Sequence, residues 1–198
     1  MYWSITGGAD EDLFVIDADT GALAFKTTGN AADGTAYAAP AYVSTTDPNY
    51  TATSNQYVVT IEASDSKTAG GHTSGLTVQV NVVDGVAPSI TSTDTFTLDE
   101  GVTSVATLQA SDTSDVVWTI NGGANQAAFI ISASGDLQFK EGQAYSSPVL
   151  VVDGKGDPVN DANGDPTYDN SANEYVVDVQ ATDEGGQQTT QTITVTLV

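Results

Sequence analysis

This chain repeats one sequence pattern twice, and the repeat constrains its fold more than any other feature. Three pairs of aromatic anchors mark the two copies: Trp3 and Trp118, Phe14 and Phe129, Tyr57 and Tyr175. The members of these pairs are 115, 115 and 118 residues apart. Chance similarity would not keep the separation so nearly constant, so the sequence predicts two copies of one structural unit.

Both copies have the local pattern of β-strands. Val, Ile, Thr and Tyr recur with a period of two in six runs, residues 57–63, 76–83, 95–98, 116–120, 175–181 and 190–197. Clusters of Gly, Asn, Asp and Ser separate the runs and predict turns. Many short strands with spaced turns indicate an all-β fold of β-sandwiches. Because Pro88 ends one strand ladder and begins another in extended conformation, we expect the units to span residues 1–84 and 85–198.

The two units are not equal. The second is complete and has an opening segment, Ser89 to Asp112, that has no counterpart in the first. A sandwich that lacks its first two strands would have an open edge and an uncovered apolar face. Two explanations stay open: the 198 residues are a piece of a longer polypeptide, or the insertion at residues 27–56 closes the first unit. The second unit has its own insertion, rich in aspartate, at residues 140–173.

The charge of the chain limits its partners. It has 26 acidic residues and only four basic ones, for a formal net charge of -22. Such a surface repels phosphate backbones and anionic lipid, and no apolar run could span a bilayer, so we expect no nucleic-acid partner and no membrane insertion. Bound divalent cations would relieve the repulsion, although a merely soluble acidic surface has the same composition. No cysteine is present for a disulfide or a thiolate metal site.

The order of the motifs resembles the cadherin repeat in the form found in giant bacterial repeats-in-toxin (RTX) adhesins. In the first copy the motifs are Trp3-Ser-Ile-Thr-Gly, Phe14-Val-Ile-Asp and Tyr57-Val-Val-Thr-Ile-Glu-Ala-Ser-Asp. The resemblance implies two tandem cadherin-like Greek-key β-sandwich units with long calcium-binding loop insertions and several bound calcium ions. It also implies a secreted or bacterial cell-surface protein of cell adhesion and biofilms, which is a monomer within a longer adhesin chain.

The resemblance further implies a set of calcium ligands. Carried over by position, the family's acidic ligands fall on Glu100, Asp112, Asp115, Asp65, Asp183, Asp169 and Asp84. The linker after Asp84 reads Gly-Val-Ala-Pro and lacks the family's Asn-Asp-Asn ligands, which argues against a three-calcium junction. We therefore expect a partial site between the units, made by Asp84, Asp112 and Asp183.

The second insertion contains a further candidate calcium loop. Acidic or amide side chains recur there at spacings of two to four residues, interleaved with glycine and proline: Asp153, Asp157, Asp161, Asn163, Asp165 and Asp169. Calcium takes six to eight oxygen ligands from flexible loops, and this spacing lets several side chains face one ion. The loop is not an EF-hand, because Pro166 occupies the glycine position and no helix is expected on either side. A solvated acidic loop is the alternative.

The most favoured function is calcium-dependent binding of a peptide or protein on another cell surface. By the resemblance, a calcium ion in the second insertion would hold the C-terminal carboxylate of the partner, with Asp153, Asp157, Asp161, Asp165 and Tyr168 as the ligand-binding residues. A calcium-stiffened extender without a ligand and a carbohydrate-binding sandwich are the alternatives. We expect no enzymatic activity, because the single histidine, His72, lies in a glycine-rich turn without the partners that catalysis needs.

Overall fold

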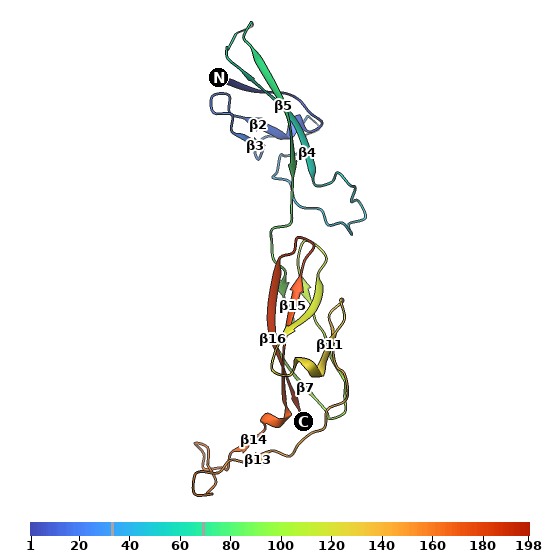
Figure 1. The fold of residues 1–198 in the computed structure, drawn as a ribbon, viewed down its shortest axis with the longest axis vertical. Coiled ribbons are helices and arrows are strands. Elements are labelled where there is room, and N and C mark those ends of the chain that lie inside the picture. The colour runs from blue at the N-terminus through green and yellow to red at the C-terminus, as the bar shows by residue number, and fades with distance from the viewer. Residues whose placement is uncertain (33, 69) are drawn as a thin grey trace. The chain divides into compact units, whose positions relative to one another are not determined.

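The computed structural model describes all residues except Asp33 and Ala69 (Figure 1). It confirms the predicted all-β fold: the described chain has sixteen strands, three single-turn 3-10 helices and no α-helix. No helix in these residues is long and apolar enough to cross a membrane. The chain forms two compact units, Met1–Asp84 and Gly85–Val198.

Unit 2, residues 85–198, is a sandwich of two main sheets. One has the strand order β10-β15-β16-β7, in which β7 runs parallel to β16, and the other has the order β11-β12-β8. The strands of these sheets are β7 (Thr95–Leu98), β8 (Ser104–Thr107), β10 (Val117–Gly122), β11 (Phe129–Ile131), β12 (Asp136–Phe139), β15 (Glu174–Thr182) and β16 (Gln188–Leu197). A small antiparallel pair, β6 (Ser89–Ile90) and β9 (Ala110–Ser111), completes the opening segment.

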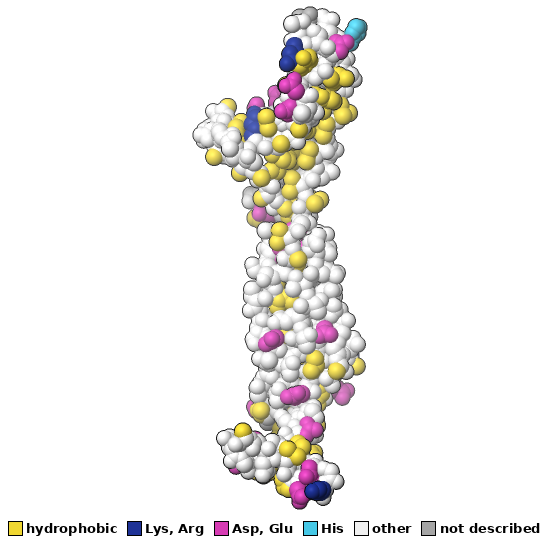
Figure 2. Space-filling model, turned by 90° about the vertical axis from the view of Figure 1, so that its left-hand side faces the viewer, with side chains coloured by type: hydrophobic (Ala, Val, Ile, Leu, Met, Phe, Trp, Pro, Cys, Tyr) yellow, Lys and Arg dark blue, Asp and Glu magenta, His cyan; other side chains and the backbone are white. Residues whose placement is uncertain are grey.

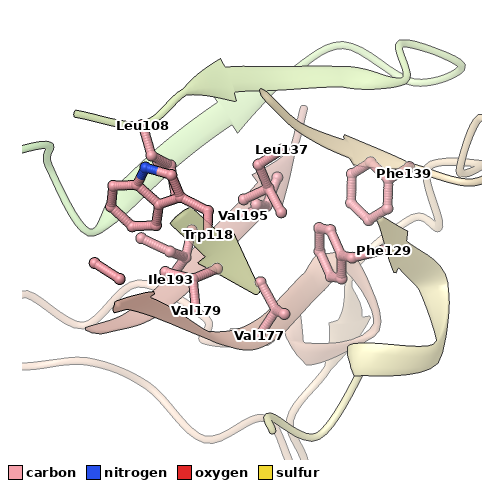
Figure 3. Close-up of a cluster of buried hydrophobic side chains, with 10 residues drawn as sticks. Leu108, Trp118, Phe129, Leu137, Phe139, Val177, Val179, Ile193 and Val195 are labelled. Carbon is pink, nitrogen blue, oxygen red and sulfur yellow. The ribbon is translucent and has the colours of Figure 1, made fainter. Parts of the chain in front are cut away.

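The core of unit 2 lies between its two sheets (Figure 3). Alternate residues of β15 and β16 are fully buried, and they meet the aromatic and aliphatic side chains of β11 and β12. The buried side chains of this core are Leu108, Trp118, Phe129, Leu137, Phe139, Val177, Val179, Ala181, Ile193 and Val195. The period-two pattern of the sequence therefore corresponds to burial on one face of each strand.

Unit 1, residues 1–84, has a smaller set of strands. Its main sheet has the order β1-β4-β5, and a hairpin of β2 and β3 packs beside it. The bounds are β1 (Tyr2–Gly7), β2 (Phe14–Ile16), β3 (Leu23–Phe25), β4 (Gln56–Ser64) and β5 (Thr73–Asn81). Only Phe14, Val59 and Ile61 are buried hydrophobic residues among those described in this unit. The first unit is thus an open version of the second.

The strands that both units share superpose residue by residue in their pairing. Trp3 lies opposite Ala63 in the β1–β4 pair, and Trp118 lies opposite Ala181 in the β10–β15 pair. In each pair the register then shifts between an isoleucine and the glycine two residues after it. The next residue, Gly8 or Gly123, has a positive φ. At Gly123 a Cβ atom would lie 2.4 Å from the backbone of the neighbouring strand, so only glycine fits this close approach.

The aromatic anchors also pack in the same way in both units. The Phe14 and Phe25 rings are 4.4 Å apart between centroids, as are the Phe129 and Phe139 rings. In each unit the second phenylalanine of the pair also makes an edge contact with the tyrosine at the second position of the long central strand, β4 or β15. The duplicated sequence anchors are therefore duplicated packing contacts.

The two insertions are made mainly of turns. Residues 26–55 contain no strand among those described, and therefore add none to either sheet edge of unit 1. The insertion of unit 2 has one short pair, β13 (Val149–Leu150) and β14 (Tyr168–Asp169), followed by a 3-10 helix, η3 (Ser171–Asn173). The possibility that residues 27–56 close unit 1 with a strand is not realised in the described part of the chain.

Candidate metal site

Three aspartates come together where the chain enters unit 2. Asp84, Asp112 and Asp183 each offer a carboxylate oxygen, and these oxygens lie within 4.8 Å of one another. They are the three residues that the sequence predicts to share a partial site. Among the residues that the structure describes, this is the only group of three or more carboxylate, histidine or cysteine side chains with such geometry.

Local structure positions two of these side chains. Asp183 directly follows β15, and one of its oxygens, Oδ1, accepts the backbone N–H of Gln187 at 2.7 Å, which closes the turn into β16. Asp112 directly follows β9, and its Oδ2 atom accepts the Ser114 hydroxyl at 3.0 Å. The same hydroxyl accepts the N–H of Glu184 at 3.4 Å, which connects the two aspartate-bearing turns.

The remaining oxygens of these two aspartates have no hydrogen-bond partner. Asp112 Oδ1 and Asp183 Oδ2 are buried, and no hydrogen bond reaches either atom from the described residues. Asp183 as a whole is only 7% exposed, and Asp84 is 5% exposed. Buried carboxylate oxygens are costly unless a donor or a cation compensates them, so this arrangement is one that a bound cation would complete.

The donor set suits an oxygen-binding cation such as calcium better than it suits zinc or copper. Two oxygens bound to one calcium ion, each about 2.3–2.6 Å away, must lie within roughly 5 Å of each other. The 4.8 Å limit of this cluster satisfies that condition. All three donors are carboxylates, and the cluster contains no histidine or cysteine, the ligands that zinc and copper prefer. Asp84, Asp112 and Asp183 would hold the ion, with backbone oxygens or water filling the other positions.

The other acidic residues of the predicted ligand set lie apart from this cluster. Asp115 is exposed and outside it, although it follows Asp112 closely in sequence. Glu100 lies just after β7, whose last residue pairs with Leu197 near the end of β16. Asp183 lies just after β15, whose last residue pairs with the first residue of β16, so Glu100 and Asp183 lie at opposite ends of the sheet. Glu100 instead accepts the backbone N–H of Tyr145 at 3.2 Å, which attaches the second insertion to the sandwich.

Asp65 is the unit 1 equivalent of Asp183, but its surroundings differ. It is exposed, and its Oδ1 atom accepts the backbone N–H of His72 at 2.8 Å. Its Oδ2 atom lies 3.2 Å from Nδ1 of the same histidine, whose side chain is 98% exposed. The single histidine therefore contacts a turn-closing carboxylate on the surface, and the expectation of no enzymatic activity stays a prediction.

The candidate calcium loop of the second insertion does not gather its carboxylates. Asp153 and Asp161 each turn Oδ1 toward backbone N–H groups of their own turn, at 2.8–3.1 Å. No three carboxylates of this loop lie together within 4.8 Å. The N–H of Asp165, and then that of Asn163, hold the pKa of Asp161 below its ordinary value. The Ser171 hydroxyl and N–H do the same for the pKa of Asp169. The metal-binding role of this loop stays a prediction.

An 8-residue repeat within the insertion explains this arrangement. Asp153-Gly-Lys-Gly-Asp157-Pro and Asp161-Ala-Asn-Gly-Asp165-Pro form the same turn, in which the first aspartate N–H donates to the carbonyl of the second at 2.8 Å. Short aspartate side chains compete effectively for nearby backbone N–H groups, so the spacing that suggested metal ligands also builds turns.

Two asparagines that sequence reasoning missed hold the insertions in place. Asn173 is fully buried, its Oδ1 accepts the N–H of Ser146 and its Nδ2 donates to the same residue's carbonyl, both at 2.7 Å. Asn55 makes the equivalent pair of bonds to Val43, both at 2.9 Å. The signal was present, since both asparagines precede the tyrosine anchor by two residues, at the same 118-residue separation.

Comparisons with known proteins give similarity of structure only. Neither protein-family models nor curated protein sequences match this chain significantly. Among solved structures, a mouse cadherin-23 fragment (EC22-24) has 16% identity and a TM-score of 0.43, with 100% of this chain and 52% of that chain covered. Human protocadherin-24 EC1-2 has 16% identity and a TM-score of 0.46, with 100% and 81% covered. The human desmocollin-1 ectodomain has 16% identity and a TM-score of 0.43, with 100% and 34% covered.

These solved structures are cadherin extracellular domains, and the chain spans about half of the first and a third of the last. Because the identities are low and the TM-scores lie below 0.5, the fold assignment rests on the strand pairing and core packing of each unit. These features establish an all-β chain with a two-sheet sandwich in unit 2 and an open copy of it in unit 1.

Proposed function

We propose that this chain is a calcium-binding, extracellular adhesion-type module in which Asp84, Asp112 and Asp183 hold a calcium ion. The observation that carries the proposal is the pair of buried carboxylate oxygens, on Asp112 and Asp183, that no donor reaches in the described structure. A divalent cation would neutralise three neighbouring negative charges. The role of such an ion is structural: it orders the end of the sandwich where the chain enters it.

Calcium titration by isothermal calorimetry tests this proposal. Wild-type protein should bind calcium, and Asp183→Asn should weaken the tightest site at least tenfold, since even changes outside the first ligand shell cost about 10- to 100-fold in metal affinity. Asp115→Asn is the matched control, because it removes the same charge from an exposed position of the same unit outside the cluster. Equal affinities for all three proteins would place the calcium site elsewhere or refute it.

The finer proposal is that the module binds a peptide or protein through a second calcium in the loop from Asp153 to Asp169. Its support is that these carboxylates are exposed and that Tyr168 beside them is 58% exposed. In addition, the backbone N–H groups of their own turns bond only one oxygen, Oδ1, of Asp153 and of Asp161 in the described structure. A peptide array with free or amidated C-termini, probed with and without calcium, tests it. Hits that require a free C-terminus and are lost in Asp161→Ala/Asp165→Ala protein would support it, and an unchanged pattern in the double variant would refute it.

A further inference from the structure

Unit 1 has two strand edges that unit 2 covers with its own chain. In unit 2, β7 pairs with the outer edge of β16, and β8 pairs with the outer edge of β12. The equivalent strands of unit 1 are β5 and β3, and each is the last strand of its sheet within the described residues. The open edges therefore lie where the duplicated unit has paired strands.

The hydrogen-bonding groups of β5 face outward at known positions. Both backbone groups of Val58 in β4 bond Asp10 on its other side: the Val58 N–H donates to the side-chain Oδ2 atom of Asp10, and the Val58 carbonyl accepts the Asp10 backbone N–H. Its partner across the pair, Gln79, therefore directs its N–H away from β4. In unit 2 the residue equivalent to Gln79 is Thr194, and its N–H donates to the Asp94 carbonyl at 2.8 Å, at the start of β7. Gln79 thus presents the donor that an added strand would use.

An uncovered apolar face lies beside this edge. Val78 and Val80 of β5 are partly exposed, whereas their equivalents Ile193 and Val195 are fully buried. Leu76, on the same face, is 62% exposed. Hydrophobic side chains gather on the face of unit 1 that is visible in Figure 2. The opening strands of unit 2, β7 and β8, thus account for the burial of Ile193 and Val195, which Val78 and Val80 of unit 1 lack.

Trp3 has the same incomplete cover. Its equivalent, Trp118, is 5% exposed and packs next to Leu108, which follows β8 (Figure 3). Trp3 is only partly buried, and a hollow of about 360 Å³ next to it is lined by Tyr2, Trp3, Ala18 and Lys67 together with three serines. Unit 1 has no residue equivalent to Leu108, because the segment that would contain it is missing from residues 1–84.

The sequence of β5 does nothing to protect its edge. Its nine residues, Thr73-Ser-Gly-Leu-Thr-Val-Gln-Val-Asn81, include no charged residue and no proline, and its pairing with β4 has no bulge. Exposed edge strands usually carry lysine, proline or a bulge, which prevent pairing with another chain. A long, flat, uncharged edge next to an apolar face is suited to strand addition.

We infer that unit 1 binds an extended polypeptide segment from outside residues 1–198, which adds a strand parallel to β5 and covers the apolar face of Val78 and Val80 beside it. The occupant has apolar residues at alternate positions, as Phe96 and Leu98 do in β7. The choice of occupant rests on unit 2, where such a segment covers the equivalent face in the same polypeptide. This inference goes beyond the proposed calcium function and does not depend on it, because no residue of the carboxylate cluster takes part.

The test uses the full chain and a synthetic peptide with the sequence of Ser89 to Asp112, compared with a peptide in which Phe96 and Leu98 are replaced by aspartate. Hydrogen–deuterium exchange should show at least tenfold slower exchange of β5 amides with the first peptide, and no change with the second. The result should be the same in calcium and in EDTA, so a failed calcium proposal would leave it standing. Absence of protection at saturating peptide would overturn the inference.

Two variants of one residue locate the added strand. Gln79→Pro removes an outward N–H without touching the β4–β5 bonds, and should weaken peptide binding at least tenfold. Gln79→Ala keeps the N–H, and should bind as the wild type does. Equal binding by both variants would overturn the inference. Protection of β5 that grows with protein concentration alone would also overturn it, because the occupant would then be a second copy of this chain.

Discussion

Replacing Asp183 by asparagine should have opposite effects on stability with and without calcium. Two unit charges 4.8 Å apart, the upper limit for this cluster, repel by about 0.9 kcal/mol in bulk water and about 3.5 kcal/mol at an effective dielectric constant of about 20. The substitution removes two of the three repulsive pairs and keeps the Oδ1 acceptor for the Gln187 N–H. Because free carboxylates can move apart, we use the lower value and expect a gain of about 2 kcal/mol without metal.

Calcium should reverse this order. A ligand present at about 1,000 times its Kd adds about 4.1 kcal/mol to the stability of the protein that binds it. In EDTA the wild type should fall below Asp183→Asn by about 2 kcal/mol, which is roughly 8 °C for a unit of this size. In calcium it should exceed the variant by about 0.7 kcal/mol for a site weakened about 100-fold, and by about 2 kcal/mol for a site that the variant has lost. Differential scanning calorimetry at low salt, with Asp115→Asn as the control, measures both. A variant that is less stable in both conditions would refute the reasoning, and so would a wild-type Tm that is the same in EDTA and calcium.

Three further predictions concern packing, ionisation and the insertion of unit 2. Leu137→Ala should lower the free energy of unfolding by about 3 kcal/mol, because this side chain is fully buried. Leu23→Ala, at the partly exposed equivalent position of unit 1, should lower it by about 1 kcal/mol. Equal losses in denaturant unfolding would contradict the difference in burial between the two units. The Thr107 hydroxyl is the main cause of a lowered pKa of Asp136. The stabilisation from this carboxylate is fully present above its ordinary pKa and is lost as pH falls through the lower folded value, so Thr107→Val should raise the pKa in an NMR titration, and an unmoved pKa would contradict the assignment. Asn173→Ala should speed amide exchange in the insertion about tenfold or more while the core of unit 2 stays protected, since two buried hydrogen bonds to the loop are lost; exchange as slow as in the wild type would show that other contacts hold the loop.

The strands and the anchors could be predicted because their signals are local. Period-two alternation identifies a strand without knowledge of its partner, and the duplicated anchors predict that both units pair alike, as Trp3 and Trp118 do. The carboxylate cluster was also anticipated as a set of residues, through Asp84, Asp112 and Asp183. Their burial, and the two oxygens left without a donor, depend on how turns far apart in sequence meet.

The second insertion shows where prediction from spacing ends. The aspartates of this loop have the spacing of metal ligands, yet Asp153 and Asp161 use that spacing to bind their own backbone. Side-chain direction decides between the two outcomes, and the sequence does not specify it. Asn173 was missed for the opposite reason: its partner, Ser146, is 27 residues away and is brought close only by the folded loop.

The sequence by itself determined that this chain is all-β, that it is built from two copies of one unit, and that residues 1–84 contain no counterpart of the segment from Ser89 to Asp112. These properties follow from residue periodicity and from the alignment of a chain with itself. Only the tertiary structure decided which residues are covered, which carboxylates meet, and which strand edges are open. The physical reason is that burial and charge clustering arise from contacts between distant segments, which local sequence patterns do not encode. Val80 and Val195 have equivalent places in the repeat, but among the described residues only Val195 has a paired strand on both sides.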